Sequence, residues 1–336
     1  MKKYLGAIFL WVFLQNTALG VVLSAGDIIV ADYQDPSTPG QIIRINPLTG
    51  QQDIISDGGL LQNPVGLAID INGDILVADR GSTFGRTGRL TRVNVATGAQ
   101  TVISTGDHFI DPFGVAVAAN GDILVSDQSA GIYGAIFRVD RNTGAQTFVS
   151  TDNYFGSPQG IEFDANGKLL VADANGPTHD GGIIRVDIDT GSQSILSSGG
   201  YFSDPVGITR DAMTNNLYIT DAQGFDSPGG AIIRVDGTTG SQSLIHSGLD
   251  LTEPIDVAIE FDGNLIVSDI DPSGTGGGPK IVRINPITGV LTNLSSGGLL
   301  GSPCGLVIYP EPAALSLLIA GALLGLRPRR LRNRRA

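Results

Sequence analysis

The chain has 336 residues, of which 47 are Gly and 17 are Pro; charged residues make up 16% and hydrophobic residues 41%. This composition excludes an intrinsically disordered chain, and so much Gly without a long apolar stretch of helical period argues against a mainly helical protein. The single cysteine, Cys304, excludes an internal disulfide and a zinc site built from cysteines.

The formal net charge is −12, but it is distributed unevenly along the chain. Residues 1–25 and 310–336 together hold eight of the 21 basic residues and one of the 33 acidic ones, so residues 26–309 carry a net charge of −19. So acidic a segment repels nucleic acid and anionic membrane surfaces. We therefore expect no nucleic-acid partner, and we expect metal cations or cationic partners to be favoured.

The N-terminus has the pattern of a secretory signal peptide. Lys2 and Lys3 precede an apolar run over residues 5–14, which is too short to span a bilayer. Small residues allow cleavage after Gly20 or after Ala25. We expect residues 1–25 to be a signal peptide read by Sec-type export machinery; the alternative is a buried N-terminal strand.

Residues 26–309 contain six copies of one unit. The tripeptide P-x-G or a variant recurs every 46 to 49 residues, at Pro64, Pro112, Pro158, Pro205, Pro254 and Pro303. An Asp that closes a V-A-D-like run recurs at Asp32, Asp79, Asp127, Asp173, Asp221 and Asp269. An Arg followed by Ile or Val, with a Thr-Gly pair after it, recurs at Arg44, Arg92, Arg138, Arg185, Arg234 and Arg283. Six copies of three separate markers define a repeat.

Each unit holds four short β-type runs, which in the third unit are residues 114–118, 122–126, 135–139 and 145–150, with hairpin turns at Asn-Gly and Thr-Gly. Four antiparallel strands in a repeat of this length are typical of a β-propeller blade. The first unit lacks its innermost strand, whereas the segment from Gly305 to Tyr309 stands alone after the last P-x-G. We expect that segment to pair with the N-terminal blade and to close an all-β, six-bladed propeller.

Residues 64–79, P-V-G-L-A-I-D-I-N-G-D-I-L-V-A-D, look like the NHL repeat and its relatives. This resemblance extends over roughly residues 26–309 and also implies a six-bladed β-propeller. The chain departs from the family pattern after the Asp, where a variable loop and an R-V-D-x-x-T-G segment replace the typical N-x-R-I run.

The loops of the expected propeller differ between its two faces. Tight hairpin turns occupy one face, and longer loops that vary between repeats occupy the other, so we expect a binding site on the variable face. The residues that precede the recurring prolines would ring the mouth of the central channel there; they are Asn63, Asp111, Ser157, Asp204, Glu253 and Ser302. Asp111, Asp204 and Glu253, helped by the neutral oxygens, would suit a Ca²⁺ ion. Alternatively, each residue simply opens a turn before Pro.

Other recurring residues have two interpretations each. Tyr154 and Tyr201 lie in equivalent blade-to-blade loops, with His108 in a third, and they either pack between blades or form a stacking platform for sugar rings. The recurring Asp and Arg are present in every unit. We therefore expect them to form the scaffold, through ion pairs within a blade or through Asp carboxylates that hold loop N–H groups.

Calcium-dependent lactonases of the gluconolactonase type are related six-bladed propellers, and resemblance to them implies an inner-strand Asn among the metal ligands. No repeat has Asn between Pro and Gly, and Asp256 is the one acid that we expect near the channel in an inner strand. The sequence has no G-x-S-x-G elbow and no His beside Cys304.

We expect a non-catalytic binding module for a protein or polysaccharide, with a Ca²⁺-dependent lactonase or esterase-like hydrolase as the alternative. The expected ligand-binding residues are Asn63, Asp111, Asp204, Glu253, Asp256, Tyr154, Tyr201 and His108.

The C-terminus has three parts, which are Pro310-Glu311-Pro312, fourteen apolar or small residues at 313–326, and a basic tail that includes Arg327, Arg329 and Arg330. Residues 310–336 closely resemble the PEP-CTERM sorting signal of Gram-negative bacteria, which implies processing by an exosortase-like enzyme. The basic tail fits cytoplasmic retention; the alternative is a docked C-terminal helix. We therefore expect export across the inner membrane, transient anchoring, and a final place at the cell surface or outside the cell, with matrix polysaccharide or an envelope protein as partner.

Overall fold

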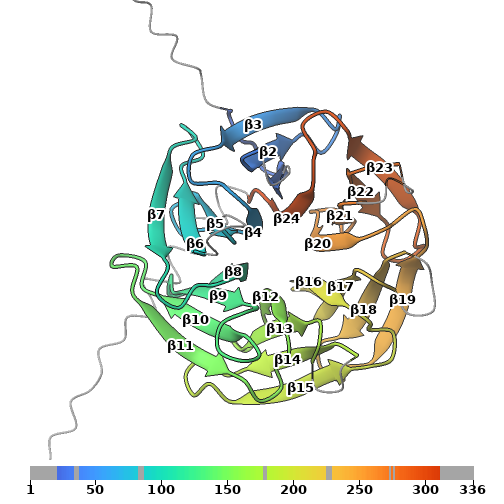
Figure 1. Cartoon of the computed structure of the whole chain (residues 1–336). Helices are drawn as coiled ribbons and strands as arrows, with labels where there is room; N and C mark the ends of the chain where they lie inside the picture. The colour runs from blue at the N-terminus through green and yellow to red at the C-terminus, as the bar shows by residue number, and fades with distance from the viewer. Residues whose placement is uncertain are drawn as a thin grey trace, which may run out of the picture.

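The computed structural model describes residues 21–33, 38–81, 87–176, 180–224, 229–271, 274 and 277–310. These residues form 24 strands in six four-stranded antiparallel sheets, which are arranged as blades around a central channel (Figure 1). The described part of the chain contains no helix, and therefore none long and apolar enough to cross a membrane. The six-bladed β-propeller expected from the repeats is confirmed.

In every blade the four strands follow one another from the channel outward. The closing blade contains β24 (Pro303–Ile308), β1 (Ile28–Asp32), β2 (Gln41–Ile45) and β3 (Gln52–Asp57). The next blades contain β4 (Pro64–Ile69), β5 (Ile75–Asp79), β6 (Arg89–Val93) and β7 (Gln100–Thr105), then β8 (Pro112–Val117), β9 (Ile123–Asp127), β10 (Ala135–Val139) and β11 (Gln146–Thr151). They are followed by β12 (Pro158–Phe163), β13 (Leu169–Asp173), β14 (Gly182–Val186) and β15 (Gln193–Ser198). The last two blades contain β16 (Pro205–Arg210), β17 (Asn216–Asp221), β18 (Ala231–Asp236) and β19 (Gln242–Ser247), then β20 (Pro254–Ile259), β21 (Leu265–Asp269), β22 (Lys280–Ile284) and β23 (Leu291–Ser296).

The ring is closed by strands from opposite ends of the repeat region. β24 pairs antiparallel with β1, with Ile308 opposite Ile28 and Val307 opposite Ile29. Beyond the strands, the Gly26 N–H donates to the Tyr309 carbonyl at 2.9 Å, and the Tyr309 N–H donates to the Asp27 carbonyl at 2.8 Å. The expected pairing of the segment after Gly305 with the N-terminal blade is confirmed, and the strand begins two residues earlier, at Pro303. This pairing removes the two free edges that an open blade would expose.

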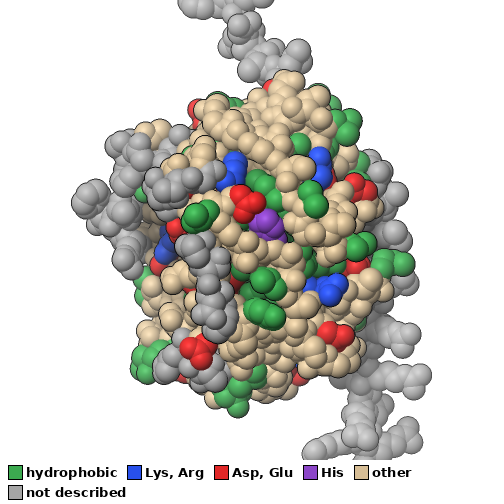
Figure 2. Space-filling view, turned by 90° about the vertical axis from the view of Figure 1, so that its right-hand side faces the viewer, with side chains coloured by type: hydrophobic (Ala, Val, Ile, Leu, Met, Phe, Trp, Pro, Cys, Tyr) green, Lys and Arg blue, Asp and Glu red, His purple; other side chains and the backbone are tan. Residues whose placement is uncertain are grey.

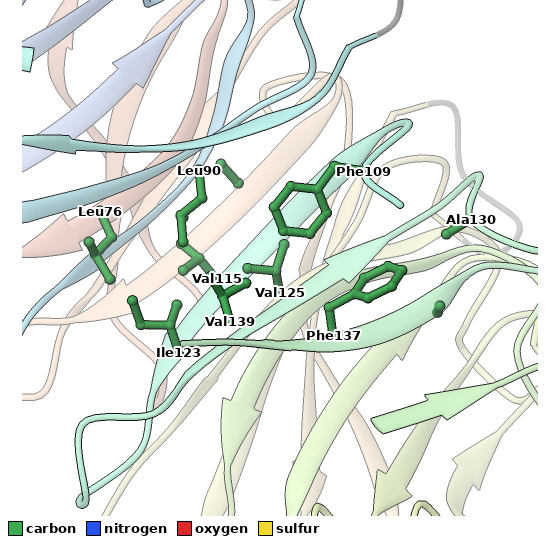
Figure 3. Packing of buried hydrophobic residues seen from close by; sticks show 11 residues of the cluster. Leu76, Leu90, Phe109, Val115, Ile123, Val125, Ala130, Phe137 and Val139 are labelled. Carbon is green, nitrogen blue, oxygen red and sulfur yellow. The ribbon is translucent and has the colours of Figure 1, made fainter. Parts of the chain in front are cut away.

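The hydrophobic core lies between neighbouring blades. The second strand of each blade is buried over its whole length or nearly so, because a blade packs on each of its sides. Figure 3 shows one such layer, in which Leu76 and Leu90 of one blade meet Val125 and Phe137 of the next. Phe109, from the loop that joins these blades, packs edge-on against Phe137, with ring centroids 5.5 Å apart and planes at 85°.

The recurring Asp residues hold the loops that join one blade to the next. All six are completely buried at the end of the second strand. The Asp127 carboxylate accepts the N–H groups of Ile110 and Asp111 at 2.8 and 3.0 Å, and Asp173 accepts those of Gly156 and Ser157. Burial raises the pKa of both carboxyls, to about 6 for Asp173. The expected scaffold role is confirmed, since the carboxylates fix the backbone just before each inner strand.

Five of the six recurring Arg residues form ion pairs at the opposite end of the blade, and the sixth, Arg234, donates to Ser243 Oγ instead. Arg92 pairs with Asp70 at 2.8 Å and Arg185 with Asp164 at 2.9 Å, where each acid opens the first hairpin turn of its blade. The recurring Arg and recurring Asp therefore do not pair with each other, because the register places Arg92 opposite Leu76 and away from Asp79. Within-blade ion pairs and Asp-held N–H groups both occur in this scaffold.

The outer strands are joined between blades by a repeated side-chain clamp. Gln100 at the start of β7 donates to Ser56 Oγ and to the Gly58 carbonyl at 2.9 and 3.1 Å, and its Oε1 accepts the Leu60 N–H at 2.6 Å. Gln52, Gln146, Gln193 and Gln242 make the equivalent contacts. Figure 2 shows the side of the ring that carries β19 and β23, where the surface is mostly uncharged and bears scattered hydrophobic side chains.

The clamp is replaced at the junction of β19 and β23. Leu291 stands there in place of Gln, and His246 stands in place of Ser. His246 Nδ1 lies 2.9 Å from the Gly289 carbonyl, and its Nε2 lies 3.0 Å from an Asp250 carboxylate oxygen. One of the six outer-wall junctions is therefore made by a histidine with its own acidic partner.

Candidate functional site

The mouth of the channel is a pocket of about 320 Å³, lined by both polar and apolar side chains, on the face that carries the longer loops, which we call the loop face. Three repeated positions line it, which are the residue before the inner-strand Pro, the residue after that Pro, and the residue after the recurring Asp. The first set includes Asn63, Asp204, Glu253 and Ser302; the second includes Val65, Phe113, Gln159, Val206, Ile255 and Cys304; the third includes Tyr33, Arg80, Gln128, Ala222 and Ile270. Asn63, Asp204 and Glu253 therefore lie where the sequence places them.

Asp111 does not line the pocket, because it is engaged by Arg80 from the neighbouring blade. Both guanidinium nitrogens Nε and Nη2 donate to the Asp111 carboxylate, the second at 2.7 Å, and Nη2 also lies 3.3 Å from Gln128 Oε1. The Arg80 guanidinium carbon lies 6.0 Å from the centre of the Phe113 ring, at cation–π range. The bidentate geometry holds Arg80 at one side of the mouth.

Asp204 and Glu253 form the acidic side of the mouth. Burial, reinforced by the charge of Asp221, raises the pKa of Asp204, and Gln223 Nε2 lies 3.3 Å from its Oδ2. Burial also raises the pKa of Glu253, with further contributions from Asp204 and Asp269. Within the residues that the structure describes, neither carboxylate has a basic partner within 4.0 Å. This side of the mouth would therefore be stabilised by a cation or by hydrogen-bond donors.

The geometry does not favour the calcium site considered for Asp111, Asp204 and Glu253. Arg80 already neutralises Asp111, and a guanidinium at this place would repel a metal cation. In the described ranges of the chain, no three side chains of the His, Cys, Asp and Glu types come close enough to hold a metal ion. The structure brings Asp204 and Glu253 together and leaves Asp111 in a separate ion pair.

Behind the mouth, the channel contains a second cavity of about 230 Å³ with two carboxylates in its wall. Asp256 on β20 accepts the Leu306 N–H through Oδ2 and the Val257 N–H through Oδ1, both at 2.9 Å. Glu162 on β12 accepts the Phe163 N–H at 2.7 Å. Burial raises the pKa of each carboxyl to about 7, and the charge of Glu162 adds to the shift of Asp256. Near neutral pH, each carboxyl is therefore divided between its protonated and its ionised form.

Asp256 stands where the other five repeats have Gly in the inner strand. A Cβ atom on Gly66 would lie 2.0 Å from the Phe113 carbonyl oxygen, and one on Gly305 would lie 2.2 Å from that of Val65. These distances show that inner strands approach too closely for a side chain. The Asp256 carboxylate reaches across that contact to β24, which belongs to the closing blade. Its place near the channel, expected from the sequence, is confirmed.

Sequence reasoning missed Glu162 and Arg80. Asp256 is not the one inner-strand acid near the channel, since Glu162 also lines its wall. A signal for Glu162 exists in the sequence, because it lies four residues after Pro158, at a position that is Ala or another uncharged residue in the other repeats. Arg80 directly follows the recurring Asp79. The structure shows that the residue after the recurring Asp lines the mouth, but the spacing of the repeats does not indicate it.

Cys304 lies in the wall of the mouth, but its thiol is not activated. Burial raises its pKa to about 12, with a further contribution from Asp32, and the thiol Sγ lies 3.4 Å from the Ser302 carbonyl. A nucleophilic cysteine needs the opposite shift, toward the thiolate. Cys304 therefore behaves as a small half-buried residue of the channel wall.

The aromatic residues expected at a ligand site lie at blade junctions on the outer wall. His108 stacks on Phe137 with ring planes at 6° and also contacts the Phe148 ring at 4.7 Å. The backbone N–H groups of His108, Tyr154 and Tyr201 donate to the clamp glutamines of the next blade at 3.0, 2.9 and 2.7 Å. None of the three lines the mouth or the channel cavity. The ring contacts of His108 and the packing of Tyr154 on the core favour packing between blades, whereas Tyr201 is 39% exposed and lines a separate outer-wall pocket with Gly200 and Gln242.

The residues expected to form the sorting signal lie almost entirely outside the described residues. Pro310 is described and follows β24 directly, whereas Glu311, Pro312, Arg327, Arg329 and Arg330 are not described. The expected signal peptide falls mainly on residues 1–20, which are not described either.

The fold and the channel define this protein as a six-bladed β-propeller whose channel mouth has an acidic side. No protein-family model matches the sequence, and no curated protein matches it. Among solved structures, the chain is similar to one in a nidogen–laminin complex, with a TM-score of 0.67 and 17% identity, covering 84% of this chain and 98% of that one.

Two further similar structures share the fold. TolB from Acinetobacter baumannii has a TM-score of 0.65 and 16% identity, over 85% of this chain and 67% of that one. Virginiamycin B lyase from Staphylococcus aureus, in a catalytically inactive form with quinupristin, has a TM-score of 0.56 and 15% identity, over 86% of this chain and 92% of that one. At these identities the likeness shows the fold alone.

Proposed function

We propose that this protein is an exported, non-catalytic binding module that takes a protein or polysaccharide ligand at the mouth of its channel. The observation that carries the proposal is the acidic side of the mouth, where Asp204 and Glu253 face a 320 Å³ pocket without a basic partner among the described residues. Basic side chains of a protein, or the hydroxyl groups of a polysaccharide, supply the donors that these carboxylates lack.

Export and anchoring belong to the same proposal and rest on the sequence alone. The charged and apolar N-terminal segment supports Sec-type export, and the P-E-P, apolar and arginine-rich C-terminal parts support transient anchoring followed by exosortase-type processing. The nidogen–laminin structure supports the binding role only by analogy, because in it a propeller of this shape is found in a complex with another protein.

The proposal is tested by capture of surface material on the immobilised protein. Envelope proteins and extracellular polysaccharide are passed over the wild type, over Asp204→Asn/Glu253→Gln, and over the control Asp262→Asn, which removes an exposed carboxylate from the opposite face. We expect the double variant to capture at least about tenfold less, because each charged hydrogen bond contributes about 1.5–3 kcal/mol. If the double variant and the control capture equal amounts of surface material, the ligand does not bind at Asp204 and Glu253 and the proposed site is wrong.

A further inference from the structure

Both ends of the described chain leave the ring on one face, opposite the mouth. The last inner strand, β24, ends at Ile308 opposite Ile28, where β1 begins. In the other blades the equivalent place is the tight turn between the first and second strands. We call this side the turn face, because it carries the first hairpin turn and the last hairpin turn of every blade.

The turn face carries large, exposed apolar side chains at positions where most of the equivalent turns have small or polar residues. Leu48 and Ile287 occupy the same position in the last hairpin turn of two blades, and each is 91% exposed. The four other repeats have Ala96, Asn142, Asp189 and Thr238 at this position. In the first hairpin turns, Met213 is 93% exposed and Phe261 is 66% exposed. Turns normally carry Gly, Pro, Asn, Asp and Ser, so four large apolar side chains on the turns of one face are a candidate interaction surface.

These four side chains lie on one half of the turn face. They come from three consecutive blades, which are β16–β19, β20–β23 and the closing blade. The turns are linked, since Arg283 Nη2 donates to the Pro47 carbonyl at 2.8 Å and the Phe261 ring lies beside Gly26. Asp211, Asp236 and Asp262 also lie in or next to the turns of this half. In the other half, among the residues that the structure describes, no turn carries a large apolar side chain of comparable exposure, and the turn residues include Asn120, Asp122, Arg141, Lys168 and Asp189. The apolar half is therefore the half from which the chain leaves.

The segment that follows Tyr309 in the sequence indicates that a membrane covers the apolar half of the turn face. Three residues separate Tyr309 from a run of fourteen apolar or small residues at 313–326, which is followed by six arginines up to Arg335. A segment of this kind partitions into a bilayer with its basic end held at the polar interface. A membrane that receives residues 313–326 therefore lies directly under the half of the turn face that bears Leu48, Phe261 and Ile287.

We propose that the turn face docks on the lipid bilayer while the C-terminal segment is inserted, with Leu48, Met213, Phe261 and Ile287 buried among the lipid headgroups and upper acyl chains. Apolar and aromatic side chains on an interfacial surface bind lipid in this way. Attraction by anionic lipid is not involved, because residues 26–309 carry a net charge of −19. The mouth then faces away from the membrane. The inference uses the anchoring of the proposed function and is independent of the ligand.

The test measures how close each face lies to lipid. Residues 21–336, the form expected after cleavage at Gly20, contain no tryptophan and are reconstituted in phosphatidylcholine vesicles with or without bromine on the acyl chains, which quenches nearby tryptophan. The probe is Ile287→Trp on the turn face, and the matched control is Ile132→Trp, an exposed isoleucine in the loop between β9 and β10 on the loop face. Adding Leu48→Glu/Phe261→Glu to the probe removes the apolar contact.

We expect bromine to lower the fluorescence of the Ile287→Trp chain about twofold and to leave that of the Ile132→Trp chain unchanged, since quenching acts only at the acyl boundary. The two added glutamates should restore the fluorescence of the probe although the chain still sediments with the vesicles. Equal quenching on both faces, or none at position 287 in a sedimenting chain, would overturn the docking and leave the anchoring intact. A chain that does not sediment with vesicles would overturn both, and the ligand-capture experiment is unaffected.

Discussion

The carboxylate of Glu162 stands at a position where the other five inner strands carry Ala68, Ala116, Thr209, Ala258 and Val307. The recurring Asp residues are also buried, but they accept several loop N–H groups and occur in every repeat. Glu162 accepts one N–H group, and burial raises its pKa to about 7. Glu162, Asp256 and Arg80 each differ from the residues at the same position in the other repeats. A property that the repeated scaffold does not explain, such as ligand binding in the channel, is therefore best sought at these residues.

Replacement of Glu162 should make stability less sensitive to pH. The folded chain keeps the Glu162 proton up to a pKa of about 7, whereas the unfolded chain releases it near 4.5. Its contribution to stability is therefore complete below pH 4.5 and is lost as the pH rises through 7. We expect Glu162→Gln to raise the free energy of unfolding by about 1–2 kcal/mol at pH 8, a value discounted for partial exposure, and to leave it unchanged at pH 4.

The measurement is urea unfolding of wild type and Glu162→Gln at pH 4, 6 and 8. Asp262→Asn, at an exposed turn residue, is the control and should not change the slope with pH. If the free energies of unfolding of the wild type and Glu162→Gln differ by the same amount at all three pH values, the raised pKa of Glu162 is contradicted.

At the scale of strands and loops, residues close together in the sequence determine the strands and turns, whereas the channel site is formed by residues far apart in the sequence. In the third unit, Asn-Gly and Thr-Gly turns fix the first and last hairpins from neighbouring residues, so the sequence predicts its four strands within two residues of β8–β11. Glu162 and Asp256, by contrast, are 94 residues apart in sequence and share the channel wall only after the ring has closed. The same holds for the pairing of Arg80 with Asp111, which joins two blades.

The outer-wall clamp gives a prediction at the scale of one junction between blades. Gln100→Ala removes the donors to Ser56 and Gly58 and leaves the Leu60 N–H without its 2.6 Å acceptor. We expect a loss of about 1–3 kcal/mol in the free energy of unfolding, which is the range for an unsatisfied buried group. Gln51→Ala is a control of the same residue type, because exposed Gln51 makes one side-chain bond at 3.3 Å; we expect a change within about 0.5 kcal/mol. Thermal and urea unfolding would show the difference, and equal effects would assign no stabilising role to the clamp.

At the scale of the whole molecule, closure by β24 makes six similar blades into one cooperative unit. Each junction between blades buries a hydrophobic layer, so five blades without the sixth inner strand would leave two such layers incomplete. β24 contributes Leu306 and Ile308 to the layer shared with β20, and Val307 and Tyr309 pack on the layer shared with β4. Asp256 adds a direct hydrogen bond from β20 to the same strand.

A chain that ends at residue 302 should therefore fail to form the closed ring, whereas one that ends at residue 310 should melt like the intact protein. Removal of β24 exposes the edge of β1 and the sides of β4 and β20, and we expect a loss of more than about 5 kcal/mol, comparable with the total stability of many domains. The measurement is calorimetric unfolding, in which the longer chain gives one transition and the shorter chain gives a broad transition or aggregates. A synthetic peptide of residues 303–310 should restore the single transition by adding its strand to β1, as donor strands do in sheets with a free edge. A single transition at an unchanged temperature in the shorter chain would show instead that the five continuous blades are stable alone, and that β24 only completes the channel wall around Asp256.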